Sequence, residues 1–133
     1  MVEKSIKMEV VTPERVVFSE EVDSLIVPAA EGYLGVLPNH APLITGLEIG
    51  VVRYKQGGRE SKMAISGGFM EVYENRAIIL ADTAEKGDEI DLERAQRAKE
   101  RAEKRLKERP PDLDVVRAEL ALKRALARIK AAQ

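Results

Sequence analysis

The chain has 133 residues, enough for one ordinary domain or for a small domain with an appendage, and its formal net charge is −1. Cysteine is absent, so disulfides and thiolate metal sites are excluded. No apolar run approaches the ~20 residues of a membrane-spanning helix, and the first residues lack the layout of a signal peptide. We therefore expect a protein that is soluble by itself and reaches a membrane only through partners.

The two parts of the chain carry opposite net charge. Residues 1–89 hold 9 basic and 15 acidic residues, a net charge of −6, whereas residues 90–133 hold 13 and 8, a net charge of +5. A basic tail behind an acidic body suits nucleic acid, an anionic ligand, an acidic protein surface or the body itself. Because the tail has no aromatic side chain for base stacking and mixes acidic with basic residues, we do not expect nucleic acid as a partner.

Residues 5–82 alternate apolar and polar side chains between frequent turn residues, as half-buried strands do. We expect Pro28 to end its strand or to place it on a sheet edge, because proline cannot donate to a ladder. The segment Gln56–Arg59 predicts a β-hairpin, since Gly57 and Gly58 adopt positive φ without strain. Many short strands at regular spacing predict a β-sandwich or flattened barrel.

After Asp91 the apolar period changes to the three-to-four spacing of an α-helix. Pro110-Pro111 ends this first helix, and we expect Asp112 to cap a second helix packed antiparallel to the first. The predicted class is α+β, with a β-sandwich over residues 1–86 and an antiparallel two-helix hairpin over residues 87–133. The expected apolar stripes are Leu92, Ala95, Ala98 or Lys99, Ala102 and Leu106, then Val115, Ala118, Leu122, Ala125 or Leu126, and Ile129.

The predicted hairpin is marginally stable by itself. Full burial of a Leu or Ile side chain contributes roughly 1.5 to 3 kcal/mol, whereas ordering the backbone of each residue costs about 1 to 2 kcal/mol. The two stripes offer few large side chains beside several alanines. Because the individual helices keep a high intrinsic propensity, we expect a hairpin that opens and closes and that a ligand or partner can bias.

The sequence contains no complete catalytic constellation. His40 is the only histidine, and no serine or carboxylate near it forms a recognisable triad or metal spacing. We therefore interpret His40 as a structural or interface residue, and we expect no metal site and no enzyme activity. The glycine runs Gly32–Gly35 and Ser66–Phe69 lie among strands and lack the lysine of a P-loop, which favours turns and close packing over phosphate binding.

Three arginines of the tail are candidates for an anion site. Arg124 and Arg128 are four residues apart and share one face of the second helix, and an antiparallel hairpin would bring Arg94 near that face. From spacing alone, a solvated basic face is the simpler interpretation. The alternative is a phosphate site, because each guanidinium offers two hydrogen bonds to phosphate oxygens. Asp91 would then accept a hydrogen bond from an exocyclic amine or orient an arginine.

Four motifs spread over nearly the whole chain carry a family resemblance: Val10–Pro13, Glu31–Leu43, Ile65–Phe69 and Arg117–Ala121. Together they resemble the epsilon subunit of the bacterial rotary F-type ATP synthase. The resemblance implies a β-sandwich followed by a two-helix domain, in agreement with the residue pattern. It also implies a non-catalytic central-stalk subunit of a proton-translocating synthase, peripheral at the cytoplasmic face of the cell membrane. The implied partners are the gamma subunit, the c-ring, and the catalytic alpha and beta subunits.

The segment Ile90–Ala95 looks like the ATP-recognition motif of epsilon subunits from bacilli, in which the folded hairpin holds ATP. This likeness implies a regulatory ATP site and reverses the preference for a solvated basic face. The residues that it implies are Glu85, Ile90, Asp91, Arg94, Ala95, Arg124 and Arg128. Tyr33 and His40 are expected at the rotor interface, although Tyr33 stands where some relatives have an acidic residue. The sequence leaves a magnesium requirement open.

The mechanism expected from these features is a switch. With ATP bound, the helices lie folded beside the sandwich, and when ATP is scarce they extend toward the catalytic subunits and stall rotation in the hydrolysis direction. The residues expected to meet acidic groups there are Arg117, Lys123, Arg124 and Arg128. The alternative is a purely mechanical module, whose hairpin inhibits through charge and shape without binding nucleotide.

Overall fold

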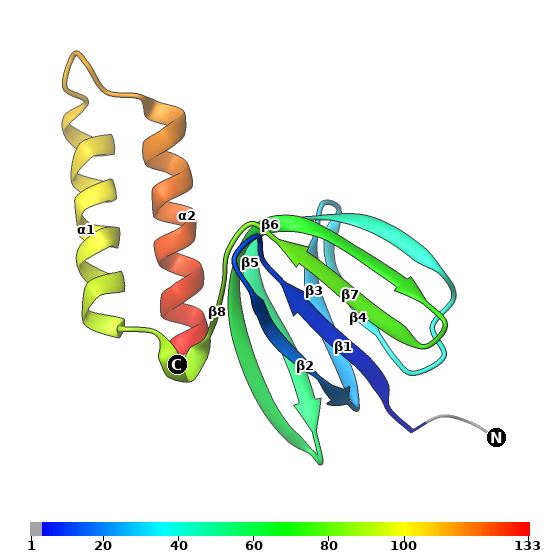
Figure 1. Cartoon of the computed structure of the whole chain (residues 1–133). Coiled ribbons are helices and arrows are strands. Elements are labelled where there is room, and N and C mark those ends of the chain that lie inside the picture. The colour runs from blue at the N-terminus through cyan, green and yellow to red at the C-terminus, as the bar shows by residue number, and fades with distance from the viewer. Residues whose placement is uncertain (1–3) are drawn as a thin grey trace.

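The computed structural model describes residues 4–133, which form a β-sandwich followed by a pair of helices (Figure 1). The α+β class expected from the residue pattern is confirmed. The strands of this part of the chain are β1 (Ile6–Val11), β2 (Val16–Val22), β3 (Ser24–Ala29), β4 (Gly32–Val36), β5 (Leu43–Gln56), β6 (Arg59–Tyr73), β7 (Arg76–Ala81) and β8 (Ala84–Lys86). Its helical elements are the 3-10 turn η1 (Gly87–Glu89), α1 (Leu92–Glu108) and α2 (Val115–Ala132).

The strands form one curled sheet in the order β2-β1-β7-β6-β5-β3-β4, and β8 pairs with β6. β1 and β7 run parallel, and the other pairs are antiparallel. The end of β2 meets the end of β5, where the Asp23 N–H donates to the Lys55 carbonyl at 2.7 Å and the Gln56 amide donates to the Glu21 carbonyl at 2.9 Å. These contacts tie the corner between β2 and β3 to the end of β5, so the curled sheet folds over itself as the predicted sandwich.

Large apolar side chains fill the inside of the sandwich. In β1, Ile6, Met8 and Val10 are fully buried and the residues between them are partly exposed, as the two-residue period of a strand requires. Phe18 and Tyr54 pack against each other with ring centroids 4.8 Å apart. This core contains no residue of α1 or α2, so the sandwich is filled without help from the helices.

Two local features of the sandwich test the sequence predictions. β5 and β6 form the predicted hairpin around Gly57 and Gly58, whose φ angles are 58° and 81°. The prediction for Pro28 is wrong, because Pro28 lies inside β3, and β3 has β4 on one side and β5 on the other. The pairing of β3 with β5 shifts register between Ile26 and Ala29, so the missing N–H falls where the ladder is already interrupted.

The two helices pack antiparallel through alanines. The residues of the predicted stripes that are buried are Ala95, Ala102, Ala118 and Ala125. The stripe prediction is wrong at Leu92, which is 38% exposed. Of the two options Ala125 or Leu126 on the second helix, Ala125 is the buried one, and Leu126 is 38% exposed. Small side chains therefore occupy the contact between the helices, and the larger leucines lie at its margins.

The second helix begins two residues later than predicted. Asp114 caps α2, because its Oδ1 accepts a hydrogen bond from the Arg117 N–H at 3.1 Å. The prediction that Asp112 is the cap is wrong. The Leu113 N–H donates to the Pro110 carbonyl at 2.9 Å and closes a turn that holds Asp112 outside the helix.

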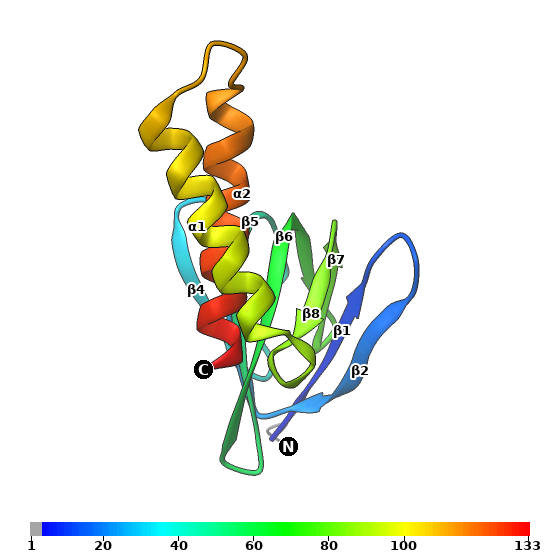
Figure 2. The same ribbon diagram turned by 90° about the vertical axis from the view of Figure 1, so that its left-hand side faces the viewer.

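The hairpin is folded against the sandwich, with α2 between α1 and the sheet (Figure 1), and the side view has α1 in front of α2 (Figure 2). Ala127 and Ala131 of α2 pack on Val51 and Ala64 in an apolar cluster separate from the sandwich core. A Cβ at Gly87 would overlap the Ala131 carbonyl oxygen, so the end of α2 rests directly on the backbone of η1. Small side chains and one glycine thus dock the hairpin.

Candidate functional site

A pocket lies at the base of the hairpin, where β8, η1, α1 and α2 meet. Its volume is about 330 Å³, which is within the usual range of small-molecule sites. We call it the hairpin pocket. Its lining residues are Glu85, Glu89, Ile90, Asp91, Arg94, Ala95, Arg97, Ala98, Arg101 and Arg128.

Six of the seven residues expected at an anion site line this pocket. They are Glu85, Ile90, Asp91, Arg94, Ala95 and Arg128. Glu85 precedes the hairpin and Arg128 lies in the last turns of α2, 43 residues further along the chain. The folded arrangement of the two helices therefore creates the pocket, and separating α2 from α1 would remove one of its walls.

Asp91 owes its position to the start of α1. It is the N-cap residue, and its Oδ1 accepts a hydrogen bond from the Arg94 N–H at 3.1 Å. The second carboxylate oxygen keeps its lone pairs for another donor. The first turn of α1 also contributes the positive end of the helix dipole, and half-buried Ile90, which packs on the apolar cluster under α2, supplies an apolar wall. One end of the pocket thus combines an acceptor, an apolar surface and positive charge.

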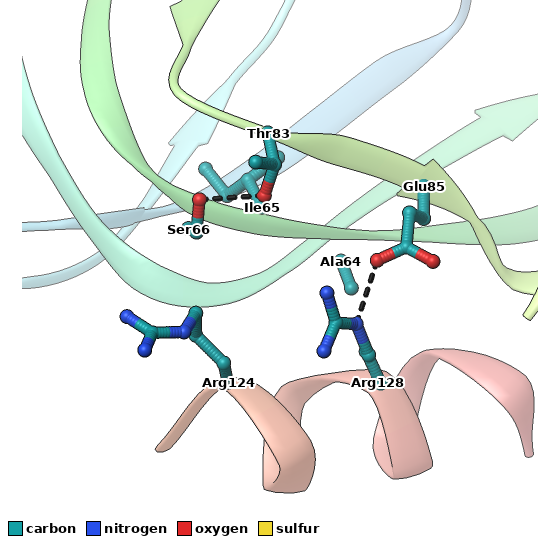
Figure 3. Close-up of a pocket in the computed structure, with 7 residues that line it drawn as sticks. All are labelled: Ala64, Ile65, Ser66, Thr83, Glu85, Arg124 and Arg128. Carbon is teal, nitrogen blue, oxygen red and sulfur yellow. Dashed lines mark hydrogen bonds and ion pairs between the residues drawn. The ribbon is translucent and has the colours of Figure 1, made fainter. Parts of the chain in front are cut away.

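An ion pair links the sandwich to the second helix in this pocket. The Arg128 Nε donates to Glu85 Oε1 at 2.6 Å (Figure 3). Both side chains are more than a third exposed, so solvent screening limits the contribution of the pair to the free energy of docking to about 1 kcal/mol or less. The bond uses only the Nε–H of Arg128, which leaves the terminal nitrogens of the guanidinium for a ligand.

Arg124 is the expected residue that does not line the hairpin pocket. It borders a neighbouring cavity of about 10 Å³ together with Ser66, Thr83, Glu85 and Arg128, and its guanidinium extends away from that of Arg128 (Figure 3). The Ser66 and Thr83 hydroxyl oxygens lie 2.6 Å apart on the sandwich side of this cavity. Arg124 is therefore one turn from the hairpin pocket, on the same face of α2 as Arg128.

The hairpin pocket offers uncompensated guanidinium groups. Arg97 lies 3.9 Å from Glu93 and Arg128 is paired with Glu85, whereas Arg94 and Arg101 have no carboxylate within 4.0 Å in the part of the chain that the structure describes. The free guanidiniums of Arg94, in the first turn of α1, and Arg101, two turns later, favour an anionic ligand with several oxygens.

Sequence reasoning missed four residues of this pocket: Glu89, Arg97, Ala98 and Arg101. Arg101 follows Arg94 by seven residues, so both lie on one face of α1. That spacing was the signal that could have identified Arg101. Glu89 had no comparable signal, because its position depends on the 3-10 turn between β8 and α1.

The four residues expected at partner interfaces lie apart from one another. Tyr33 is exposed on β4, near the C-terminal end of α2, and His40 follows β4 in a turn where its Nδ1 lies 2.7 Å from the Ala41 carbonyl. Arg117 and Lys123 are exposed on α2. Tyr33 thus lies beside the C-terminal end of α2, His40 lies beside the turn between β6 and β7 that holds Asn75, and the other two lie along the hairpin.

Residues 4–133 contain no group of three or more His, Cys, Asp or Glu side chains arranged to hold a metal ion. None of the helices in this range is long and apolar enough to cross a bilayer.

Comparisons with known proteins agree over the whole chain. Residues 5–87 match the family model described as ATP synthase, Delta/Epsilon chain, beta-sandwich domain, and residues 88–133 match the one described as ATP synthase, Delta/Epsilon chain, long alpha-helix domain. The chain is 55% identical over 130 residues to the ATP synthase epsilon chain of Desulforamulus reducens, covering 98% of each. It is 59% identical over 129 residues to that of Moorella thermoacetica, covering 96% of each.

A solved structure shares the same fold. It is a chain of the Euglena gracilis mitochondrial ATP synthase, in a structure described as OSCP/F1/c-ring in rotational state 1. The TM-score is 0.82 at 28% sequence identity, and the match covers 99% of this chain and 83% of that one. The chain therefore belongs to the ATP synthase delta/epsilon chain family, as an epsilon chain, a non-catalytic subunit of the synthase.

Proposed function

We propose that this chain is a rotor subunit in the central stalk of a proton-translocating F-type ATP synthase, peripheral at the cytoplasmic face of the cell membrane, and that its hairpin inhibits ATP hydrolysis in an ATP-sensitive way. The sandwich contacts the gamma subunit and the c-ring, with Tyr33 and His40 at that interface. The high identity to bacterial epsilon chains supports this assignment. The presence of F1 and the c-ring in the complex of the Euglena relative supports the choice of partners.

The proposal that ATP is the regulatory ligand is based on the hairpin pocket. Its single supporting observation is that six of the expected residues line one cavity of about 330 Å³ although they come from β8, the linker, α1 and α2. The guanidiniums of Arg94 and Arg128 bind the phosphates through charge-assisted hydrogen bonds. The free oxygen of Asp91 accepts from the exocyclic amine of adenine, beside the apolar wall of Ile90. Arg124 joins the phosphates from the neighbouring turn of α2.

ATP controls the hairpin because the ligand binds only the folded form. At about 100 times its dissociation constant, such a ligand stabilises that form by roughly 2.7 kcal/mol, which is close to a hundredfold shift in population. When ATP is scarce, α2 leaves the sandwich and the hairpin extends toward the alpha and beta subunits. Acidic groups there bind the exposed basic residues Arg117, Lys123, Arg124 and Arg128.

Calorimetry with ATP, ADP and GTP tests the nucleotide site. Loss of a charge-assisted hydrogen bond costs about 1.5 to 3 kcal/mol, so we expect Arg94→Ala to weaken ATP binding by roughly tenfold or more. Lys104→Ala removes a positive charge from α1 outside the pocket and should leave the affinity within about twofold. Equal affinity of the wild-type protein and Arg94→Ala for ATP would contradict the proposed site.

One observation favours the mechanical alternative. The Glu85–Arg128 ion pair and the contact of Ala127 and Ala131 with the sandwich join the hairpin to the sandwich through protein contacts alone. The two functions differ in the response of assembled synthase to added ATP. If the hairpin acts through charge and shape alone, Asp91→Ala combined with Arg94→Ala leaves that response unchanged. If ATP is the ligand, the double variant inhibits hydrolysis equally at low and high ATP.

A further inference from the structure

A separate groove lies where the C-terminal end of α2 meets the outer face of the sheet. Its volume is about 470 Å³, and it shares no lining residue with the hairpin pocket. We call it the foot groove. Its walls come from β3, β4, β5, β6 and α2 and include Ile26, Tyr33, Val51, Arg53, Lys62 and Lys130. Because one wall belongs to α2, the groove is complete only while the hairpin is docked.

The foot groove gathers positive charge on a sandwich that is acidic as a whole. Arg53 of β5 lies directly opposite Lys62 of β6 in the ladder, and like charges in this arrangement destabilise a sheet. In the part of the chain that the structure describes, Arg53, Lys62 and Lys130 have no carboxylate side chain within 4.0 Å. Lys62 donates instead to the Gln133 carbonyl oxygen at 3.1 Å, which holds its ammonium group at the groove. Since residues 1–89 have a net charge of −6, three cations without counterions here indicate a surface that meets negative charge.

The remaining walls of the foot groove are largely apolar. The side chains of Ile26 and Tyr33 are exposed, and Tyr33 pairs with Pro28 across β4 and β3. A Cβ at Gly50 of β5 would lie 2.7 Å from the Pro28 Cβ and 3.5 Å from the Tyr33 Oη. The missing side chain of Gly50 therefore allows both residues to lie close to β5. An exposed tyrosine next to an arginine is a combination that is enriched where proteins bind each other.

We propose that the foot groove binds an acidic segment of a partner polypeptide that also carries an apolar side chain. Carboxylates of the segment pair with Arg53, Lys62 and Lys130, and its apolar side chain covers Ile26 and the Tyr33 ring. A phosphate chain would satisfy the cations but would leave this apolar surface in water, so a peptide is the better match.

The foot groove connects partner binding to the state of the hairpin. Because Lys130 belongs to α2, the acidic segment binds the docked hairpin more tightly than the extended one and stabilises it without nucleotide. Tyr33 is expected at the rotor interface, so the identification of the partner as a rotor subunit rests on the proposed function. The peptide site itself does not depend on that function.

Titration of the full chain with an oligoglutamate peptide that has a central leucine tests this site. We expect an affinity that falls as salt is added. Arg53→Gln combined with Lys62→Gln should weaken binding roughly tenfold or more, because two charge-assisted contacts are lost. The matched control Arg15→Gln with Arg59→Gln removes the same charge from exposed positions outside the groove and should change the affinity less than about twofold. Equal weakening in the two double variants would refute the site.

Two further variants test the apolar wall and the opposed cations. Tyr33→Ser should weaken binding of the leucine-containing peptide but not of an all-glutamate peptide with the same charge. Arg53→Gln should raise the midpoint of urea unfolding, because it removes one of two like charges that face each other. A lower midpoint would show that Arg53 stabilises the fold and would contradict its role as a binding residue.

Competition and a hairpin-pocket variant separate this proposal from the ATP site. Without ATP, Arg94→Ala should leave the affinity for the peptide unchanged, so failure of the nucleotide site does not affect this test. Tripolyphosphate should displace the peptide only weakly. Complete displacement by tripolyphosphate at a concentration equal to that of the peptide would identify a phosphate compound as the occupant and overturn the proposal.

Reconstitution with synthase that has been depleted of this subunit tests the choice of partner. The Arg53 and Lys62 double variant should bind the depleted synthase roughly tenfold more weakly than the wild-type chain, and the Arg15 and Arg59 control should bind like wild type. Unchanged binding of the first double variant would show that no rotor subunit occupies the groove.

Discussion

The sandwich and the hairpin are held together by different kinds of side chain. The sandwich buries large residues such as Met63, Met70 and Ile79 completely, whereas the contact between the helices and their contact with the sandwich consist mainly of alanines. Each buried CH₂ group contributes about 0.8 kcal/mol, so the hairpin gains far less per ordered residue. The chain thus joins a stable body to an element whose docking is weak enough for one ligand to control.

The largest effect is expected in the sandwich core. Ile79→Ala removes a fully buried side chain from the middle of β7, and we expect a loss of about 2 to 5 kcal/mol in the free energy of unfolding. Leu126→Ala, at a 38% exposed position of α2, should cost about 0.5 kcal/mol or less. Urea unfolding measures both. Similar losses in the two variants would contradict the contrast between the regions.

A smaller effect is expected where α2 meets the sandwich. Gly87→Ala places a methyl group against the Ala131 carbonyl, with the Lys62 carbonyl oxygen 3.2 Å away, and overpacking of this kind costs about 1 to 3 kcal/mol. Because the overlap with Ala131 exists only in the docked hairpin, amide exchange in α2 should accelerate while that of β1 in the sandwich stays unchanged. Gly46→Ala is the control, since a Cβ there has no atom within 4 Å. Equal exchange in both variants would show that Gly87 does not hold the helix.

The start of α2 provides a test with an internal control. Asp114→Ala removes the helix cap and should cost about 1 kcal/mol, seen as increased amide exchange in the first turn. Asp112→Ala, two residues earlier, removes an equal charge that makes no cap and should have little effect. A larger loss of stability for Asp112→Ala than for Asp114→Ala would show that Asp112 is the cap.

The smallest effect concerns alkaline pH. Burial of Tyr54, followed by the charges of Asp88 and Glu20, raises its pKa above 10.0. The unfolded chain therefore loses this proton first as pH rises, so the contribution of Tyr54 to stability is complete below about pH 10 and is lost as pH passes the raised pKa. The free energy of unfolding, measured in urea, should therefore fall less steeply above about pH 10 for Tyr54→Phe than for the wild-type protein. Identical slopes would mean that the phenol does not titrate differently on folding.

The sequence predicts most of the architecture, because its strongest signals are local. Gly57 and Gly58 specify a turn whatever surrounds them, and Pro110-Pro111 ends a helix in any context. Pro28 was misjudged because a register shift in β3, invisible in the sequence, tolerates the missing N–H. Asp112 was misjudged because the turn closed by the Pro110 carbonyl decides which aspartate meets the helix.

The site was predicted less completely than the fold. Helix spacing made Asp91, Arg94 and Arg128 candidates, the resemblance favoured an anion site over a solvated face, and the structure places all three in the lining of one pocket. Arg101 was missed because its seven-residue spacing places it on the face of Arg94, but the apolar pattern of an alanine-rich helix does not tell which face turns toward α2. The hairpin pocket also depends on the packing of α1 and α2 through alanines, which only the folded structure reveals.

The distance between the two helices tests the central claim most directly. The chain has no cysteine, so spin labels on introduced cysteines at Lys104 and Glu119, both exposed on the hairpin, report on these positions alone. At millimolar ATP we predict a single short distance between the labels, and without ATP a broad distribution at longer distances. The Arg94→Ala variant should show the broad distribution whether or not ATP is added. The same distance distribution with and without ATP would contradict an ATP-controlled hairpin.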